Sequence, residues 1–170
     1  IGFAQQFGAV GIIHCVNSLP QHHVGGLMPV FRSAECGGRV HEVIGDELML
    51  GFDAACDGAR GARAIQEVVE GFAGETGNRL EVRIGLHCGP VFIATDPITK
   101  HRLYSGLHTS RTARIEPITP PGQVYASSAF AAVTAARQVG NLRFSYIGRT
   151  RLAKHYGVLP LYHVKRAARR

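Results

Sequence analysis

A carboxylate next to a glycine, between two short apolar runs, is the first feature of this sequence that could do chemistry. Asp46 follows Gly45, and the runs Arg39–Ile44 and Glu47–Phe52 flank the pair. This pattern predicts a tight β-hairpin with the carboxylate at its tip. Carboxylate oxygens suit Mg²⁺, although a Gly-Asp pair is also common in ordinary turns. Asp46 is therefore a candidate metal ligand whose interpretation depends on the neighbouring motifs.

The histidines and cysteines form no recognisable metal or disulfide framework. His87 and His108, among nine histidines, have no partner at the His-x(3)-His spacing of helical zinc sites. The four cysteines are far apart in the sequence, and no two form a Cys-x-x-Cys pair: Cys15, Cys36, Cys56 and Cys88. We expect neither a zinc site nor disulfides, and a reducing cytoplasm fits this cysteine usage best.

Positive charge is concentrated in the second half of the chain. The net charge is +7, and it divides into −4 over residues 1–85 and +11 over residues 86–170. A basic half suits nucleic acid, an acidic membrane surface or a phosphorylated small substrate, and it can also be only a solvated face. No basic block is interleaved with aromatic residues, so we expect no nucleic-acid partner, and nucleic-acid binding is a minor alternative. No apolar run reaches the roughly 18 residues of a membrane span, and no signal peptide is visible.

The elements that must position these groups alternate between strands and helices. The 170 residues are 45% apolar and 18% charged, so we expect one domain over 1–170 with its own core. Expected strands are 10–15, 39–44, 47–52, 80–86, 91–94, 123–126, 143–147 and 159–165, with a turn at Gly89-Pro90. Expected helices are 53–72, 106–116 and one capped by Ser127 or Ser128 that ends near 137. A helix over 23–36 is interrupted by Gly25, Gly26 and Pro29. This mixture predicts an α+β sandwich with a largely antiparallel sheet and flanking helices.

Four motifs follow one another with compatible spacing. They are Gly-Gly-x-Val-x(3)-Ile-Gly-Asp at 37–46, Arg-Ile-Gly-x-His-x-Gly-Pro-Val at 83–91, Ala-Arg-Ile-Glu at 113–116 and Pro-Gly-Gln-Val at 121–124. In this order they resemble the catalytic domain of class III nucleotidyl cyclases, the adenylate and guanylate cyclase family. The resemblance covers residues 37–165, and residues 1–36 are atypical.

The resemblance implies a reaction and an assembly. A ribose 3′-hydroxyl attacks the α-phosphate of a nucleoside triphosphate, and pyrophosphate leaves. Two Mg²⁺ or Mn²⁺ ions activate the nucleophile and hold the phosphates, and cations offset the charge that develops there. The active sites lie at the interface of a head-to-tail homodimer, so each site takes residues from both subunits.

Matching the motifs position by position gives roles to individual residues. The resemblance places Asp46 on a metal-binding Asp, Arg114 on the Arg that stabilises the transition state and Lys154 on the Lys that contacts the triphosphate. Without these roles, Asp46 would be an ordinary turn residue, Arg114 a cation on a helix surface and Lys154 a solvated loop residue. His87 matches a strand position that is packed and hydrogen-bonded, and His108 suits a capping or surface role.

Several positions depart from the family pattern. The family's first strand carries a second metal-binding Asp, but here the first acidic residue is Glu35. Either that ligand is lost, or it belongs to residues absent from this sequence. Ser110 replaces the Asn that holds the ribose. Glu42 and Leu103 occupy the base-reading positions; Glu42 can accept from guanine or cytosine, and the usual adenine pair is not present.

Two functions from different classes follow. The first is an active cyclase of unassigned base specificity, which acts in second-messenger signalling and, if the base is a pyrimidine, in anti-phage defence. The second is a cyclase-like domain without turnover that binds nucleotide or a partner. A carboxylate on the first strand distinguishes the two functions.

Overall fold

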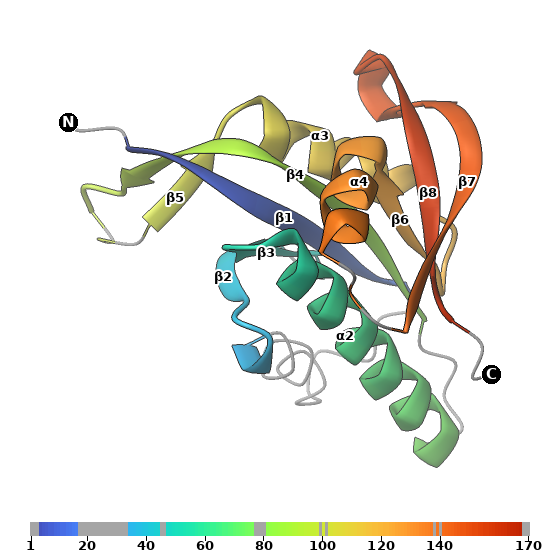
Figure 1. Cartoon of the computed structure of the whole chain (residues 1–170). Helices are drawn as coiled ribbons and strands as arrows, with labels where there is room; N and C mark the ends of the chain where they lie inside the picture. Colours follow the sequence, from blue (N-terminus) through green and yellow to red (C-terminus); the bar gives the residue numbers. More distant parts are fainter. Residues whose placement is uncertain are drawn as a thin grey trace.

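A single mixed sheet organises the part of the chain that the structure, a computed structural model, describes: residues 4–16, 34–44, 47–76, 81–98, 100, 102–137, 139 and 141–167. The sheet has eight strands in the order β2-β3-β1-β4-β6-β8-β7, and β5 pairs with β4 outside this path (Figure 1). The strands are β1 (Ala4–Val16), β2 (Arg39–Ile44), β3 (Glu47–Phe52), β4 (Glu81–Thr95), β5 (Arg102–Ser105), β6 (Val124–Ser127), β7 (Leu142–Arg151) and β8 (Val158–Arg166). The helices are α2 (Ala55–Thr76), α3 (Leu107–Ile115) and α4 (Ser128–Ala136), with 3-10 turns η2 (Glu116–Ile118) and η3 (Ala153–His155).

The pairing of the strands confirms the expected α+β fold. Every described strand pair is antiparallel except β4 with β6, which run parallel. The β2–β3 hairpin is present, with a bulge between Val40 and Glu42. Ser127 caps α4 as expected, because its Oγ accepts the Phe130 N–H. Gly45 and Asp46, and most of the interrupted helix over 23–36, lie outside the described residues.

The turn expected at Gly89-Pro90 is wrong, because β4 continues through both residues. Gly89 pairs with Gly8, and Pro90 with Phe7, on the β1 side. On the opposite edge, β6 pairs only with 84–86 of β4 and β5 only with 92–95. Pro90 therefore sits between the two pairings on that edge, where a missing backbone N–H breaks no ladder hydrogen bond.

Helices cover both faces of the sheet. On one face, α2 and α4 pack over the main core, whose fully buried members include Leu50, Ile65, Ile84 and Phe130. Successive strand residues point to opposite faces, and Gly85, next to Ile84, faces the backbone of Glu116 beyond the end of α3. The face that carries α3 is thus opposite the main core. Among the described helices, none is both long enough and apolar enough to cross a bilayer.

Candidate functional site

Helix α3 carries Ser110 and Arg114, and the buried face of the helix determines how exposed these two side chains are. Thr109, Thr112 and Ile115 are buried, so Ser110 and Arg114 stay half-buried at the margins of that face. Gly106 precedes the helix with a φ of 125°, a left-handed conformation that favours glycine. Arg114 occupies the last turn, where a cation is stabilised by the helix dipole.

The Arg114 guanidinium is only partly bonded within the described residues. Its Nη1 donates to the Ala113 carbonyl over 3.2 Å, and its Nε is buried without a hydrogen-bond partner among them. Its central carbon lies 5.5 Å from the centroid of the Tyr156 ring. The arrangement leaves the outer guanidinium N–H groups, rather than the buried Nε, to an anion that approaches α3.

Lys154 lies on η3, which contacts α3. Ile115, Leu152 and Leu161 form a small core that links the two elements. Ile115 directly follows Arg114, and Leu152 lies two residues before Lys154. Lys154 is exposed, with φ 53° and ψ 38°. The structure therefore places the two predicted catalytic cations on elements that contact each other.

The two predicted base-reading residues lie on β2 and β5, which also contact each other. Glu42 is exposed on β2. Leu103 lies on β5 and pairs with Ala94 of β4, although the Leu103 side chain is outside the described residues. Their sequence neighbours join the strands, because the Tyr104 N–H donates to His41 Nε2 over 3.1 Å. The His41 and Tyr104 rings also meet edge to face, with centroids 5.0 Å apart.

A hydrogen-bonded pair of histidines, the buried His87 of β4 and the half-buried His108 of α3, is the feature that sequence reasoning missed. His87 on β4 bonds Ser127 Oγ through Nδ1 at 2.7 Å and His108 Nδ1 through Nε2 at 2.9 Å. Burial, followed by the proximity of His108 and Arg111, lowers the pKa of His87 to about 4. Burial and Arg111 also lower the pKa of His108. His87 is packed and hydrogen-bonded as expected, whereas His108 is stacked on it and is not a free surface group.

A second polar contact ties the end of α3 to β4. Glu116 is buried, and its Oε1 lies 3.5 Å from Nε of Arg83. Close packing accompanies this ion pair, because a Cβ on Gly85 would lie 2.7 Å from the Glu116 backbone nitrogen. These contacts, with the histidine pair, fix α3 on the strand that carries the Arg-Ile-Gly motif.

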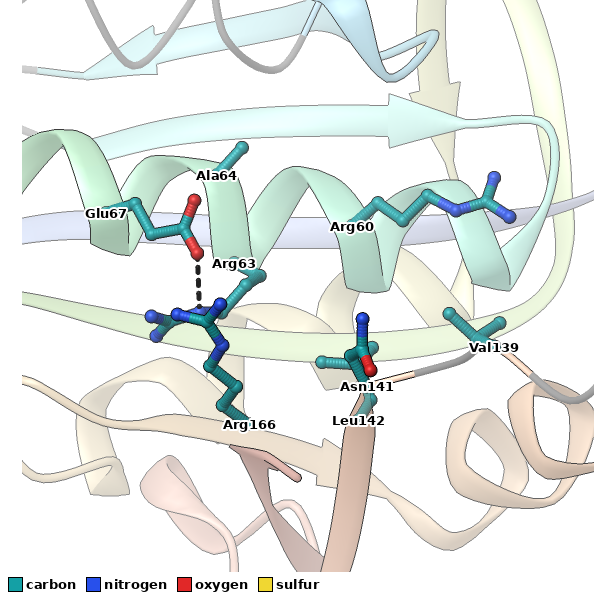
Figure 2. A pocket seen from close by; sticks show the side chains of 8 residues that line it. All are labelled: Arg60, Arg63, Ala64, Glu67, Val139, Asn141, Leu142 and Arg166. Carbon is teal, nitrogen blue, oxygen red and sulfur yellow. Dashed lines mark hydrogen bonds and ion pairs between the residues drawn. The ribbon is translucent and has the colours of Figure 1, made fainter. Parts of the chain in front are cut away.

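A pocket of about 220 Å³ between α2 and the ends of β7 and β8 is separate from these groups (Figure 2). Its lining includes Arg60, Arg63 and Arg166 but none of the predicted site residues. Acidic neighbours offset much of its charge: Arg60 pairs with Asp57 at 2.9 Å, and Arg63 with Glu67 at 3.1 Å. The candidate site is therefore assigned to α3 and η3 rather than to this pocket.

The described residues do not assemble the two-carboxylate set that a two-metal site needs. No three His, Cys, Asp or Glu side chains among them are grouped as metal ligands. The 13 residues of β1 include no Asp or Glu, and Asp46 lies outside the described part of the chain. Asp46 therefore stays a prediction.

Comparison with known sequences gives a partial match and no family. No protein-family model matches the chain. One curated relative, a putative serine/threonine-protein kinase/receptor of Acanthamoeba polyphaga mimivirus, is 32% identical over 87 residues. That match covers 51% of this chain but only 5% of the length of the viral protein.

Solved structures match almost the whole chain. The guanylate cyclase domain of RhGC from Catenaria anguillulae, in complex with GTP, superposes with a TM-score of 0.81 at 18% identity, over 97% of this chain and 100% of that one. The adenylyl cyclase CyaB from P. aeruginosa gives 0.81 at 13% identity, over 99% and 98%. The non-canonical dimeric guanylyl cyclase domain of the RhoGC fusion protein from Blastocladiella emersonii gives 0.80 at 18% identity, over 98% and 100%.

Proposed function

We propose that this chain, whose fold is that of class III nucleotidyl cyclase catalytic domains, converts a nucleoside triphosphate into a 3′,5′-cyclic monophosphate and pyrophosphate. The observation that carries the proposal is the contact between two elements of the site: α3, which carries Arg114, and η3, which carries Lys154, meet beside one small core. Two cations on contacting elements suit the phosphates of a triphosphate.

The chemistry assigns a charge-stabilising role to both side chains. The ribose O3′ bonds to the α-phosphorus, the bond from that phosphorus to the oxygen of the leaving pyrophosphate breaks, and the proton of the 3′-hydroxyl is released to water. Negative charge grows on the phosphate oxygens during this exchange. Arg114 donates N–H groups toward that charge, and Lys154 supplies a compact ammonium to the departing phosphates.

Recognition of the nucleoside belongs to the other predicted residues. Ser110, half-buried on α3, offers a hydroxyl to the ribose. Glu42 on β2 accepts a hydrogen bond from a base that presents an amine, such as guanine or cytosine. Leu103 on the contacting strand β5 provides apolar contact alone. The neighbouring folds include both guanylate and adenylyl cyclases, so the base is left open.

The working protein is proposed to be a metal-dependent homodimer. Asp46 is the metal ligand that we assign, for Mg²⁺ or Mn²⁺, and the metal ions would activate the attacking hydroxyl when bound. The cyclase domain from Blastocladiella, which forms a non-canonical dimer, supports association of two copies but not a particular arrangement of them. The cyclic product would serve as a second messenger, in the cytoplasm, and a pyrimidine product would fit anti-phage signalling.

A second candidate function rests on β1. A strand without Asp or Glu favours a domain that binds nucleotide, or a partner protein, without turnover. Such a domain would keep Arg114 and Lys154 as phosphate ligands and lack the metal chemistry.

One experiment distinguishes the two functions. Purified protein is incubated with ATP, GTP, CTP or UTP and Mn²⁺, with and without EDTA, and the products are identified by mass spectrometry. We expect a cyclic monophosphate from one triphosphate, lost with EDTA and in Arg114→Ala. The matched control is Arg60→Ala, which removes one positive charge from α2 and should keep full activity. A folded dimer that binds a triphosphate but forms no product would support the second function.

A further inference from the structure

The aromatic ring beside Arg114 is that of Tyr156, two residues after Lys154 in the sequence. Tyr156 follows the η3 turn, is 40% exposed, and places its ring 5.5 Å from the guanidinium carbon. A guanidinium next to an aromatic ring is attracted to the ring without using any of its N–H donors. The ring can therefore hold Arg114 in place while the donors stay available.

The backbone of the turn explains how Tyr156 comes to face α3. Lys154 and His155 have φ values of 53° and 57°, so two successive non-glycine residues are left-handed. Such conformations are uncommon in L-residues and persist where surrounding contacts hold them. Here the Leu152 N–H donates to the Gly157 carbonyl over 2.9 Å and closes the turn. The turn exposes Lys154 and returns the chain so that Tyr156 reaches Arg114.

We infer that Tyr156 is a positioning residue, which orients Arg114 and couples it to the turn that carries Lys154. The effect on turnover rests on the proposed function, whereas the contact between Tyr156 and Arg114 does not. The Tyr156 ring lies beside the guanidinium, and Nη1 donates to the Ala113 carbonyl. Together these contacts fix the orientation of the guanidinium before a substrate binds. The substrate then meets an ordered cation, and less side-chain entropy is lost in the transition state.

The contact can be tested without turnover, because the chain contains no tryptophan. Tyr156→Trp introduces a single tryptophan, which can be excited selectively over the tyrosines and is also the strongest aromatic partner for a cation. We expect Arg114→Ala in this background to shift the emission to longer wavelength and to increase quenching by acrylamide, since it uncovers the ring. The matched control is Arg111→Ala, one turn earlier on α3, which should leave both unchanged. Equal spectra with and without Arg114 would overturn the inference.

A second pair of variants tests the effect on the reaction. Tyr156→Phe keeps the ring and should retain the wild-type kcat, whereas Tyr156→Leu should lower kcat about two- to fivefold, the range of an exposed cation–π contact. KM should change less than kcat, because the ring acts through Arg114 and not on the substrate. Equal losses in Phe and Leu, or a loss confined to KM, would overturn the positioning role.

Failure of the inference and failure of the proposed function give different results. If the wild-type protein makes no cyclic product, the proposed function fails, while the tryptophan emission still decides the contact with Arg114. If Tyr156→Trp does not fold, the NMR shift of the Arg114 Nε–H replaces it. The chemical shift of the Arg114 Nε–H in Tyr156→Phe should equal the wild-type value, and in Tyr156→Leu it should differ. The same chemical shift in both variants would contradict the contact.

Discussion

His87 makes the stability of the folded chain sensitive to pH. Because its pKa is lowered to about 4, His87 is neutral when folded and takes up a proton near pH 6.5 when unfolded. Its contribution is therefore complete above pH 6.5 and is lost as the pH falls toward 4. We expect the free energy of unfolding, measured by urea titration, to fall by up to about 3 kcal/mol across this window. His87→Gln should reduce the pH dependence of the free energy of unfolding, and the exposed control His155→Gln should leave it unchanged. The same pH dependence in wild type and His87→Gln would show that His87 is not its cause.

At the scale of elements, the spacing of α3 from β4 depends on a glycine. A Cβ on Gly85 would lie 2.7 Å from the Glu116 nitrogen and 3.2 Å from the Thr112 carbonyl, and both are backbone atoms that cannot rotate away. We expect Gly85→Ala to destabilise the fold by about 1–3 kcal/mol. The control is Gly71→Ala on α2, where a Cβ meets nothing within 4 Å, and which should stabilise by about 0.5–1 kcal/mol. Thermal unfolding measures both, and a neutral Gly85→Ala would show that α3 can move.

Elements with local sequence signals could be predicted, and contacts that depend on the packing of distant segments could not. The β2–β3 hairpin and the Ser127 cap have local signals, and both are confirmed. Whether β4 bends at Pro90 depends on which strands pair along its other edge, and no local pattern contains that information. The His87–His108 contact joins residues that only the packing of α3 on β4 brings together. The roles of the site residues, and the assignment of 1–170 to one domain, stay predictions.

For the whole molecule, shared active sites predict complementation between inactive variants. Mixing Asp46→Ala with Arg114→Ala should restore up to about a quarter of wild-type activity, because half of the randomly mixed dimers regain one of two sites. Mixing Arg114→Ala with Lys154→Ala should restore none, since both cations lie on contacting elements of one subunit and serve the same site. Activity of the refolded mixtures is the measurement. Equal recovery in both mixtures would contradict the division of the site between subunits.

The position of β1 in the sheet has a consequence during synthesis. β1 comes early in this chain but lies between β3 and β4, and it pairs with β4 along all 13 of its residues. Until Glu81–Thr95 has left the ribosome, that edge has no partner, and a long unpaired edge is a template for aggregation. We therefore expect a nascent chain stalled before β4 to be prone to aggregation, and this tendency should end when β4 emerges and pairs with β1.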